Sequence, residues 1–465
     1  KYIQRFLMIG CLSLARETFD IDFAKTKLAK TKKLIRKFDN NINFFDDLIT
    51  NDKIGEGAIK YYENNKCSKF IVIQSTFTDA KFISAFVKKF KKPILFISFK
   101  EKRTGSRLRL NSLCGVNLGL HALIKNKFYS NFINYSNDEQ SFSSEILKFI
   151  KKNNNLTKKN YLKKLNLKTV TKKITDFKQP KLGLIGERPE GFDTCDFNNQ
   201  ELKSKFNAKI AKIDLQNLFS ISRKVDKKKI NTTKKIISTK LKNLSQVNQK
   251  ELNRSISLFH GFEQIQQKQN IDAFAVRCWP EMFTEYGCAS CGPMAMMNEN
   301  KISSACEADV LGSLTCNILN QLNNKPALLV DIVDVDEKDN TTVFWHCGLA
   351  PISMAEKNTP SATVHSNRRK PLLHNFAFKS GDITIFRVSK SENKLKFIVM
   401  NGRVLKRKNS FSGTSGVITL GKNTHKKIKN LFLSGLEHHV GFTYGDVFED
   451  IKSLGKQLKI PTYTI

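Results

Sequence analysis

We start from residues 305–348, which contain the segments ACEADV (305–310), ALLVDIV (327–333) and FWHCG (344–348). The first segment leads into an apolar run with helical spacing, and the second has the composition of a buried strand. Two carboxylates, Glu307 and Asp331, therefore stand beside apolar runs, where an unpaired charge is costly. This placement predicts that both carboxylates face a cation.

A pair of histidines near the other end of the chain adds a third possible ligand. The segment GLEHH (435–439) places His438 and His439 shortly after a glycine. Two carboxylates with a histidine suit a divalent metal of the manganese type, which binds oxygen together with some nitrogen. Taken alone, the histidine pair is also compatible with a surface turn, and His346 with a hydrogen-bonded core histidine.

Four cysteines surround this part of the sequence: Cys278, Cys288, Cys291 and Cys306. Cys288 and Cys291 form a C-x-x-C, but the second C-x-x-C of a zinc ribbon is missing. Methionines follow Cys291, so this part of the chain is apolar. We therefore interpret the four cysteines as buried thiols near a pocket. Across the chain, ten dispersed cysteines favour reduced thiols in a cytoplasmic protein over a disulfide framework.

Composition limits the class of protein. A chain of 465 residues is too long for one core, so we expect two or three domains. The net charge of +37 raises the question of nucleic-acid binding. The lysines are scattered, however, and aromatic residues do not interleave with them as on a stacking surface, so no nucleic-acid partner is expected. No apolar run reaches membrane-spanning length, which predicts no membrane helix.

The first hundred residues alternate between strand and helix patterns, beginning with a strand at Phe6–Cys11. A buried strand is expected at 70–73, a helix capped by Asp79 follows, and another strand covers 94–98. This rhythm predicts a parallel sheet, whose ligands lie beyond the carboxyl ends of its strands. Gln74–Thr78 occupies such a position.

Later segments mark the remaining units. The Lys-rich stretch 151–180 is expected to be a solvated helix or linker at a domain boundary. A second α/β unit begins at 181–186, where the glycines do not follow dinucleotide spacing. Short strands with glycine turns at 382–388, 395–400 and 416–420 predict a small antiparallel barrel.

We therefore expect an α/β protein with two Rossmann-like parallel-sheet units, followed by a C-terminal, mostly antiparallel β-barrel domain. The expected domains are 1–165, then 166–325 with Glu307, and finally 326–465 with Asp331 and His439. The site is expected where the second and third domains meet.

The combination of Glu307, Asp331 and a late histidine resembles the L-fucose/L-arabinose isomerase family, in particular the shorter L-fucose isomerase-like proteins. In that family a glutamate and an aspartate at this interval bind manganese together with one histidine. The segments NSLCG (111–115) and RCWPE (277–281) also look like segments of those proteins.

The resemblance implies roles for individual residues. Glu307, Asp331 and His439 would bind a divalent metal, which the resemblance implies to be Mn²⁺, and the two carboxylates would also act as catalytic acid and base. His438 stays an alternative ligand, because the family motif has one residue between glycine and the histidine pair, whereas this chain has two. The substrate-binding residues implied are His346, Trp279, Arg277, Gln74, Arg109, Asn111 and His121.

The family resemblance also implies a homo-oligomer, a hexamer or trimer, whose neighbouring subunits complete each site. Arg109, Asn111 and His121 would then act in trans. The expected activity is a metal-dependent aldose–ketose isomerisation of an open-chain sugar through an enediol. One alternative substrate is a sulfonated hexose such as sulfoquinovose, for which Arg277, Arg188 or Arg109 could supply the cation. The alternative from another class is a non-catalytic basic protein that binds nucleic acid or sugar.

Overall fold

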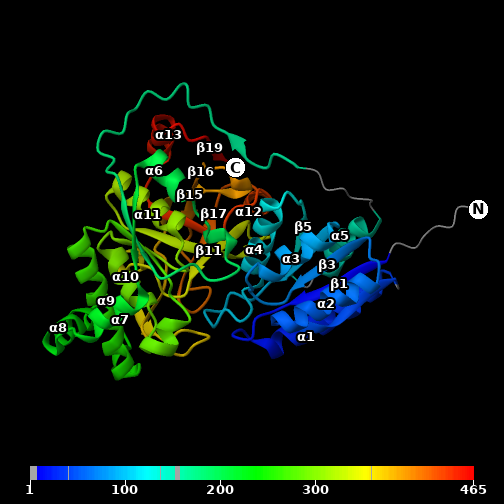
Figure 1. The fold of residues 1–465 in the computed structure, drawn as a ribbon, viewed down its shortest axis with the longest axis horizontal. Coiled ribbons are helices and arrows are strands. Elements are labelled where there is room, and N and C mark those ends of the chain that lie inside the picture. Colours follow the sequence, from blue (N-terminus) through cyan, green and yellow to red (C-terminus); the bar gives the residue numbers. More distant parts are fainter. Residues whose placement is uncertain (1–7, 40, 137, 152–157, 358) are drawn as a thin grey trace, which may run out of the picture.

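The computed structural model describes residues 8–465, apart from residues 40, 137, 152–157 and 358. The described residues form three sheets, which we call the first, second and third sheets in chain order. Figure 1 shows the first sheet and its helices, coloured blue to cyan, on the right, and helices α7–α9 at the lower left. The expected mixed α/β class with two parallel sheets is confirmed.

The first sheet is entirely parallel and has the strand order β2-β1-β3-β4-β5. Helices α1 and α5 cover one face, and α2, α3 and α4 cover the other, because alternate residues of each strand point to opposite faces. Its elements are β1 (Ile9–Leu14), α1 (Ile21–Arg36), β2 (Ile42–Ile49), α2 (Asp52–Asn64), β3 (Lys69–Gln74), α3 (Lys81–Phe90), β4 (Ile94–Phe99), α4 (Ser112–Lys125), β5 (Asn131–Tyr135) and α5 (Glu139–Lys151).

The second sheet is also parallel, with the order β10-β9-β7-β8. Helices α6 and α11 pack on one face, and α7, α9 and α10 pack on the other. Its elements are β7 (Lys181–Ile185), α6 (Asn199–Phe206), β8 (Lys209–Ile213), α7 (Leu215–Arg223), α8 (Lys227–Ser238), α9 (Gln249–Gln269), β9 (Ala273–Val276), α10 (Cys291–Glu299), β10 (Ser303–Ala305) and α11 (Val310–Asn323).

The third sheet has ten strands in the order β13-β14-β17-β12-β11-β18-β15-β16-β19-β6, and β16 also pairs with β17. Its elements are β6 (Lys163–Lys164), β11 (Ala327–Asp336), β12 (Thr341–His346), β13 (Ser361–Thr363), β14 (Leu373–Ala377), β15 (Gly381–Ser389), β16 (Lys396–Val404), β17 (Thr414–Thr419), α12 (Thr424–Leu433), β18 (His439–Tyr444), α13 (Phe448–Gln457) and β19 (Thr462–Thr464). Short helical turns complete the fold: η1 (Asp193–Cys195), η2 (Leu244–Gln246), η3 (Met282–Tyr286), η4 (Ile352–Met354) and η5 (Ser391–Asn393).

The expectation of a mostly antiparallel barrel is only partly matched. Most neighbours in the third sheet are antiparallel, but β14–β17 and β16–β19 are parallel. The sheet is therefore mixed, because β14 and β19 are added to it through longer connections rather than through hairpins. The short strand β6 joins its far edge beside β19.

Helix α11 connects the second and third sheets. Its residues Leu311 and Leu314 pack in one core with Leu182 and Ala273 of the second sheet and with strands of the third. A side chain at Gly441 in β18 would come within 2.7 Å of Thr315, so the close approach of α11 requires glycine there. The helix thus fixes β10, which precedes Glu307, against β18, which carries His439.

Several local expectations were wrong or incomplete. The N-cap position of α3 is Ala80 rather than Asp79, but the Asp79 carboxylate accepts the backbone N–H of Lys81 at the start of the helix and also pairs with Arg16. The stretch 158–180 contains only the short strand β6, so the linker interpretation holds for it, while 152–157 lie outside the described residues. The first strand is Ile9–Leu14, later than expected, and Phe6 also lies outside the described residues.

No helix in the described part of the chain is long and apolar enough to cross a membrane.

We predict that Phe86→Ala destabilises the unit built on the first sheet by about 3–5 kcal/mol, because it removes a fully buried ring and leaves a cavity. The Phe86 ring lies 4.6 to 6.1 Å from four aromatic rings of α2, β3 and α3. Urea unfolding followed by circular dichroism measures the effect. Ile236→Ala, at a side chain that is 54% exposed, is the control and should change stability by less than about 0.5 kcal/mol. Equal effects of the two substitutions would contradict this account of the core.

Candidate active site

The candidate site lies where strand ends of all three sheets meet. Trp279 and Glu307 follow the carboxyl ends of β9 and β10 in the second sheet. Arg16 and Thr76 follow β1 and β3, between which the strand order of the first sheet reverses. Ligands of open parallel sheets bind at such positions. The third sheet contributes Asp331, His346 and His439 from β11, β12 and β18.

Glu307 and Asp331 both lie next to His439. Asp331 and His439 are direct partners across the antiparallel pair β11–β18. The Nε2 atom of His439 lies 3.5 Å from Asp331 Oδ1 and 3.9 Å from Glu307 Oε2. Glu307 approaches His439 from a left-handed backbone conformation, with φ of 58°. The three residues that the sequence placed in one ligand set are therefore neighbours.

The second nitrogen of His439 is held by a buried ion pair. His439 Nδ1 donates a hydrogen bond to Asp309 Oδ2 at 2.9 Å. Arg387 binds the same carboxylate with two N–H groups at 2.8 and 3.1 Å, and both partners are buried. Because Nδ1 is engaged with Asp309, Nε2 is the nitrogen turned toward Glu307 and Asp331.

His438 has a different environment from His439. Its Nε2 donates to Glu307 Oε2 at 2.9 Å, while its Nδ1 is buried without a hydrogen-bond partner among the described residues. Trp279 donates its indole N–H to the other oxygen of Glu307 at 3.2 Å. Glu307 is thus oriented by two donors, and His439 rather than His438 faces both carboxylates.

Comparison with known proteins decides the family. Residues 10–177 match the fucose/sulfoquinovose isomerase N-terminal domain, and residues 374–465 match the L-fucose isomerase C-terminal domain. The chain is 30% identical to a sulfoquinovose isomerase from Priestia megaterium (strain ATCC 12872 / QMB1551) over 464 residues, which cover 97% of both chains. It is 30% identical to one from Alkalicoccus urumqiensis over 99% of both chains, and 25% identical to one from Clostridium sp. (strain MSTE9) over 97% of this chain and 98% of that one.

The chain belongs to the fucose/sulfoquinovose isomerase family. It is therefore an aldose–ketose isomerase, as expected from the resemblance of its carboxylates and late histidine to that family.

The residues around His439 could hold the metal that an isomerase of the fucose isomerase type suggests. Two groups of potential ligand atoms share His439: one with Cys195, Glu307 and His438, the other with Cys306 and His346. Asp331 Oδ1 is buried, accepts no hydrogen bond from the described residues and lies beside His439 Nε2. A buried carboxylate oxygen without a donor is costly unless a cation faces it, so the donor chemistry fits a metal.

The two carboxylates of this isomerase have unlike pKa values. Burial raises the pKa of Asp331, although the nearby histidines oppose the shift. Burial would also raise the pKa of Glu307, but the hydrogen bond and the charge of His438, whose own pKa is raised by Glu307, lower it below its ordinary value. Burial and the adjacent His438 lower the pKa of His439, which keeps its ring neutral. A neutral imidazole is the form that binds metals.

Four of the expected sugar-binding residues belong to the units of the first and second sheets or to β12, and of these four only Trp279 and His346 lie within the site. His346 Nε2 is 3.1 Å from Cys306 Sγ, and its ring stacks on His439 with centroids 6.1 Å apart. Arg277 lies at the edge, where its guanidinium is bound to Glu281 and to a backbone carbonyl. Gln74 is buried and donates to Thr76 and Thr78, so it holds the loop after β3.

The three residues expected to act in trans lie at different places. His121 is buried and bonds the carbonyl of Gly435 in its own chain at 2.8 Å. Asn111 precedes α4 in a left-handed conformation, and its buried Oδ1 has no partner among the described residues. Arg109 is paired with Asp20 and stacks on Phe23 at the surface. Their action across a subunit interface stays a prediction.

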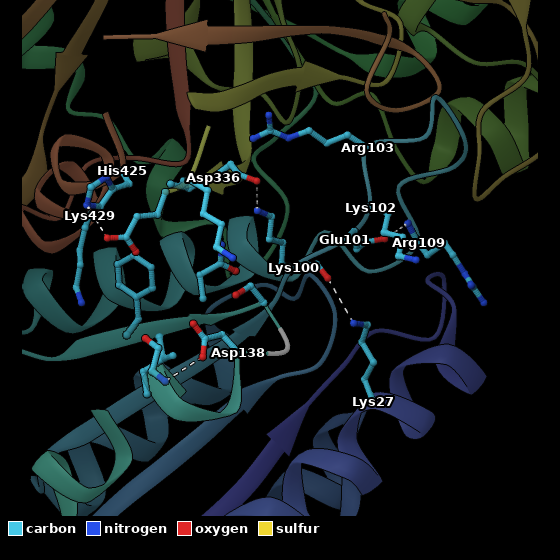
Figure 2. A pocket seen from close by; sticks show the side chains of 18 of the residues that line it. Lys27, Lys100, Glu101, Lys102, Arg103, Arg109, Asp138, Asp336, His425 and Lys429 are labelled. Atoms are coloured by element: carbon cyan, nitrogen blue, oxygen red, sulfur yellow. Dashed lines mark hydrogen bonds and ion pairs between the residues drawn. The ribbon is translucent and has the colours of Figure 1, made fainter. Parts of the chain in front are cut away.

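Arg109 lines a separate cleft of about 1410 Å³ between α1 of the first sheet and α12. Lys27, Lys100, Lys102 and Arg103 also line it, together with acidic residues such as Asp336, which pairs with Lys100 (Figure 2). None of Glu307, Asp331 and His439 lies in its lining. Part of the basic charge of this isomerase therefore gathers away from the site.

Sequence reasoning missed Asp309, Arg387, Arg16 and Arg368 near the site. Asp309 follows Glu307 by two residues, which was the available signal for a second buried carboxylate. The cysteines behave as expected: all ten are free, and nine are buried. The thiol of Cys306 has its pKa raised by Cys278 and by burial, so it stays protonated in these surroundings.

We predict that Arg387→Met destabilises this isomerase by about 3–5 kcal/mol, because Asp309 and the nearby Glu437 would keep buried charges without their cation. Thermal unfolding monitored by calorimetry measures the change. Arg403→Met is the matched control, since it removes the exposed Arg403–Asp382 pair of the same sheet and should cost at most about 1 kcal/mol. A similar loss in both variants would refute the special role of the buried pair.

Proposed function

We propose that this chain is a divalent-metal-dependent isomerase that converts a sulfonated aldohexose, sulfoquinovose, into its ketose. The observation that carries the metal centre is the position of Glu307 and Asp331 beside His439, with a donorless buried oxygen on Asp331. The sulfonated substrate is supported by the relatives above, which share the chain over nearly its whole length and are named sulfoquinovose isomerases.

The proposed ligands are Glu307, Asp331 and His439. Carboxylate oxygen with one imidazole nitrogen suits Mn²⁺, Mg²⁺ or Co²⁺ better than a thiol-rich set would. The alternative set of Cys306, His346 and His439 requires a thiolate, whereas the neighbouring Cys278 thiol and burial raise the pKa of Cys306. Both nitrogens of His346 have partners, since Nε2 contacts Cys306 Sγ and Nδ1 accepts the backbone N–H of Cys347, so a sugar hydroxyl would bind His346 by replacing the Cys306 contact.

The reaction moves a proton between C2 and C1 of the open-chain sugar through an enediol. When bound, the metal polarises the carbonyl and stabilises negative charge on the two sugar oxygens. Glu307, whose pKa is lowered, is the proposed base that removes the C2 proton. Asp331, whose pKa is raised, is the proposed acid. Two carboxylates with separated pKa values can divide these roles.

Trp279 and Asp309 are proposed as positioning residues. Trp279 fixes the Glu307 carboxylate by its indole N–H, and Asp309 fixes the tautomer of His439. The homo-oligomer with sites completed by a neighbour, the cytoplasmic location and the three-domain division remain predictions beside this proposal.

We predict that removal of divalent metal by a chelator abolishes ketose formation, and that adding back Mn²⁺, Mg²⁺ or Co²⁺ restores it. The assay follows ketose formation from sulfoquinovose, L-fucose and L-arabinose, and elemental analysis of the same samples gives the metal content. Full activity in a metal-free sample would contradict metal dependence. Turnover of L-fucose or L-arabinose alone would contradict the sulfonated substrate.

Two histidine variants provide the matched control for the ligand set. His439→Gln should lose bound metal, because its Nε2 faces both carboxylates, whereas His438→Gln should keep it. The reverse result would assign His438 as the ligand.

We predict that Glu307→Gln and Asp331→Asn each lower kcat by about 100- to 10 000-fold while the fold stays intact, because each removes a proton-transfer group. Stopped assays give kcat, and circular dichroism checks folding. The exposed Asp382→Asn serves as the control and should leave kcat unchanged. A wild-type rate in either site variant would remove that residue from the mechanism.

A further inference from the structure

Two guanidinium groups lie over the indole ring of Trp279 at the candidate site. The Cζ atom of Arg16 is 5.1 Å from the ring centroid, and that of Arg368 is 5.5 Å from it. The same indole donates its N–H to Glu307. One side chain therefore links the proposed catalytic carboxylate to two positive charges.

The two cations differ in how far their charge is already neutralised. Arg16 forms an ion pair with Asp79 at 2.7 Å. Arg368 has no carboxylate within 4.0 Å among the residues that the structure describes, and its guanidinium packs on Trp279 and Phe283. Burial lowers the pKa of Arg368, and the nearby positive charge of Arg16 lowers it further. A desolvated cation beside a like charge is stabilised by any anion that binds there.

The arginines that the sequence suggested as partners of an anionic sugar already form ion pairs with carboxylates. Arg277 is bound to Glu281, Arg188 pairs with Asp193 and Asp196, and Arg109 pairs with Asp20. Binding a substrate anion through any of them would require breaking an existing ion pair. Arg368 needs no such exchange.

The turn that carries Arg368 is held in place. The Nδ1 atom of His365 accepts the backbone N–H groups of Asn367 and Arg368. Arg107 donates two N–H groups to the Asn367 side chain at 3.0 and 2.7 Å. Burial and the charge of Arg368 lower the pKa of His365 to about 3, so its ring is a neutral acceptor. The backbone that carries Arg368 is thus fixed before a ligand arrives, and its guanidinium packs on Trp279 and Phe283, which reduces the entropy lost on binding.

We propose that Arg368 forms an anion subsite beside Trp279 that receives the charged group at C6 of an anionic hexose. The proposal rests on the proposed function, because it takes the C1–C2 end of the sugar to lie at Glu307 and Asp331. A sulfonate carries a permanent charge and three oxygen acceptors, which match the planar donors of arginine. A C6 phosphate shares this chemistry, so the test includes both anions.

The test compares wild type, Arg368→Gln and Arg368→Lys on three aldoses: sulfoquinovose, glucose 6-phosphate and the uncharged 6-deoxyglucose. Arg368→Gln should lower kcat/KM for the preferred anionic sugar by about 10- to 100-fold, mainly through KM, because a hydrogen-bonded charge is lost. Its kcat/KM for 6-deoxyglucose should stay within about threefold of wild type, since that sugar makes no charged contact. Arg368→Lys should recover part of the loss. Arg188→Gln is the control for general positive charge and should not alter the preference.

A binding measurement separates this proposal from the catalytic one. Calorimetry with the alditol of sulfoquinovose, which has no carbonyl and cannot isomerise, should give binding to wild type that Arg368→Gln weakens by a similar factor. This result would support the subsite even if no aldose were turned over. Equal losses on charged and uncharged sugars, or a wild-type enzyme without preference for an anion, would overturn the subsite while leaving an isomerase intact. Preference for glucose 6-phosphate would support the subsite and assign phosphate as its ligand.

Discussion

The buried guanidinium of Arg387 organises the polar groups behind the candidate active site. It binds Asp309, which in turn accepts the Nδ1 proton of His439. It also lies 3.8 Å from the Glu437 carboxylate, which accepts the backbone N–H of Lys390. A cation this deep is tolerated because its negative partners are equally buried. The orientation of His439, and through it the shape of the site, depends on this one charge balance.

The site also depends on three sheets being held together, since each supplies only part of it. The first sheet brings Arg16, the second brings Trp279 and Glu307, and the third brings Asp331 and His439. Helix α11 packs between the second and third sheets, and its first turn is capped by Asp309. The same carboxylate therefore begins the helix and orients the histidine. Asp309 therefore couples the packing of α11 to the orientation of the His439 ring.

Much of the fold followed from local patterns, because buried strands and amphipathic helices differ in their period. The strands around residues 70–73, 94–98 and 382–388 lie close to where these patterns placed them. The local patterns did not predict the mixed third sheet, because its parallel pairings β14–β17 and β16–β19 join strands that are distant in sequence. Composition and period carry no information on which distant strands pair.

The site was predictable to a similar degree. The family resemblance placed Glu307, Asp331 and His439 in one ligand set, and both carboxylates do lie beside His439, while their role as metal ligands stays a prediction. Asp309 and Arg387 were missed because their importance comes from a contact across 78 residues of chain. Arg368 was missed for the opposite reason, since what distinguishes it from Arg277, Arg188 and Arg109 is the absence of a carboxylate partner within the described structure. The absence of a carboxylate near a side chain is a property of the folded structure and cannot be read from an amino-acid sequence.

The left-handed backbone at Glu307 has a consequence for how this protein can be altered. Glu307 and Ala308 have φ values of 58° and 53°, a conformation that costs a residue with a side chain about 1–2 kcal/mol and costs glycine almost nothing. Replacement of Glu307 by glycine would relieve the strain at this position but would leave the N–H groups of His438 and Trp279 without their acceptor. Engineering of this loop for stability therefore has to select for turnover at the same time, because the strained position also carries the carboxylate.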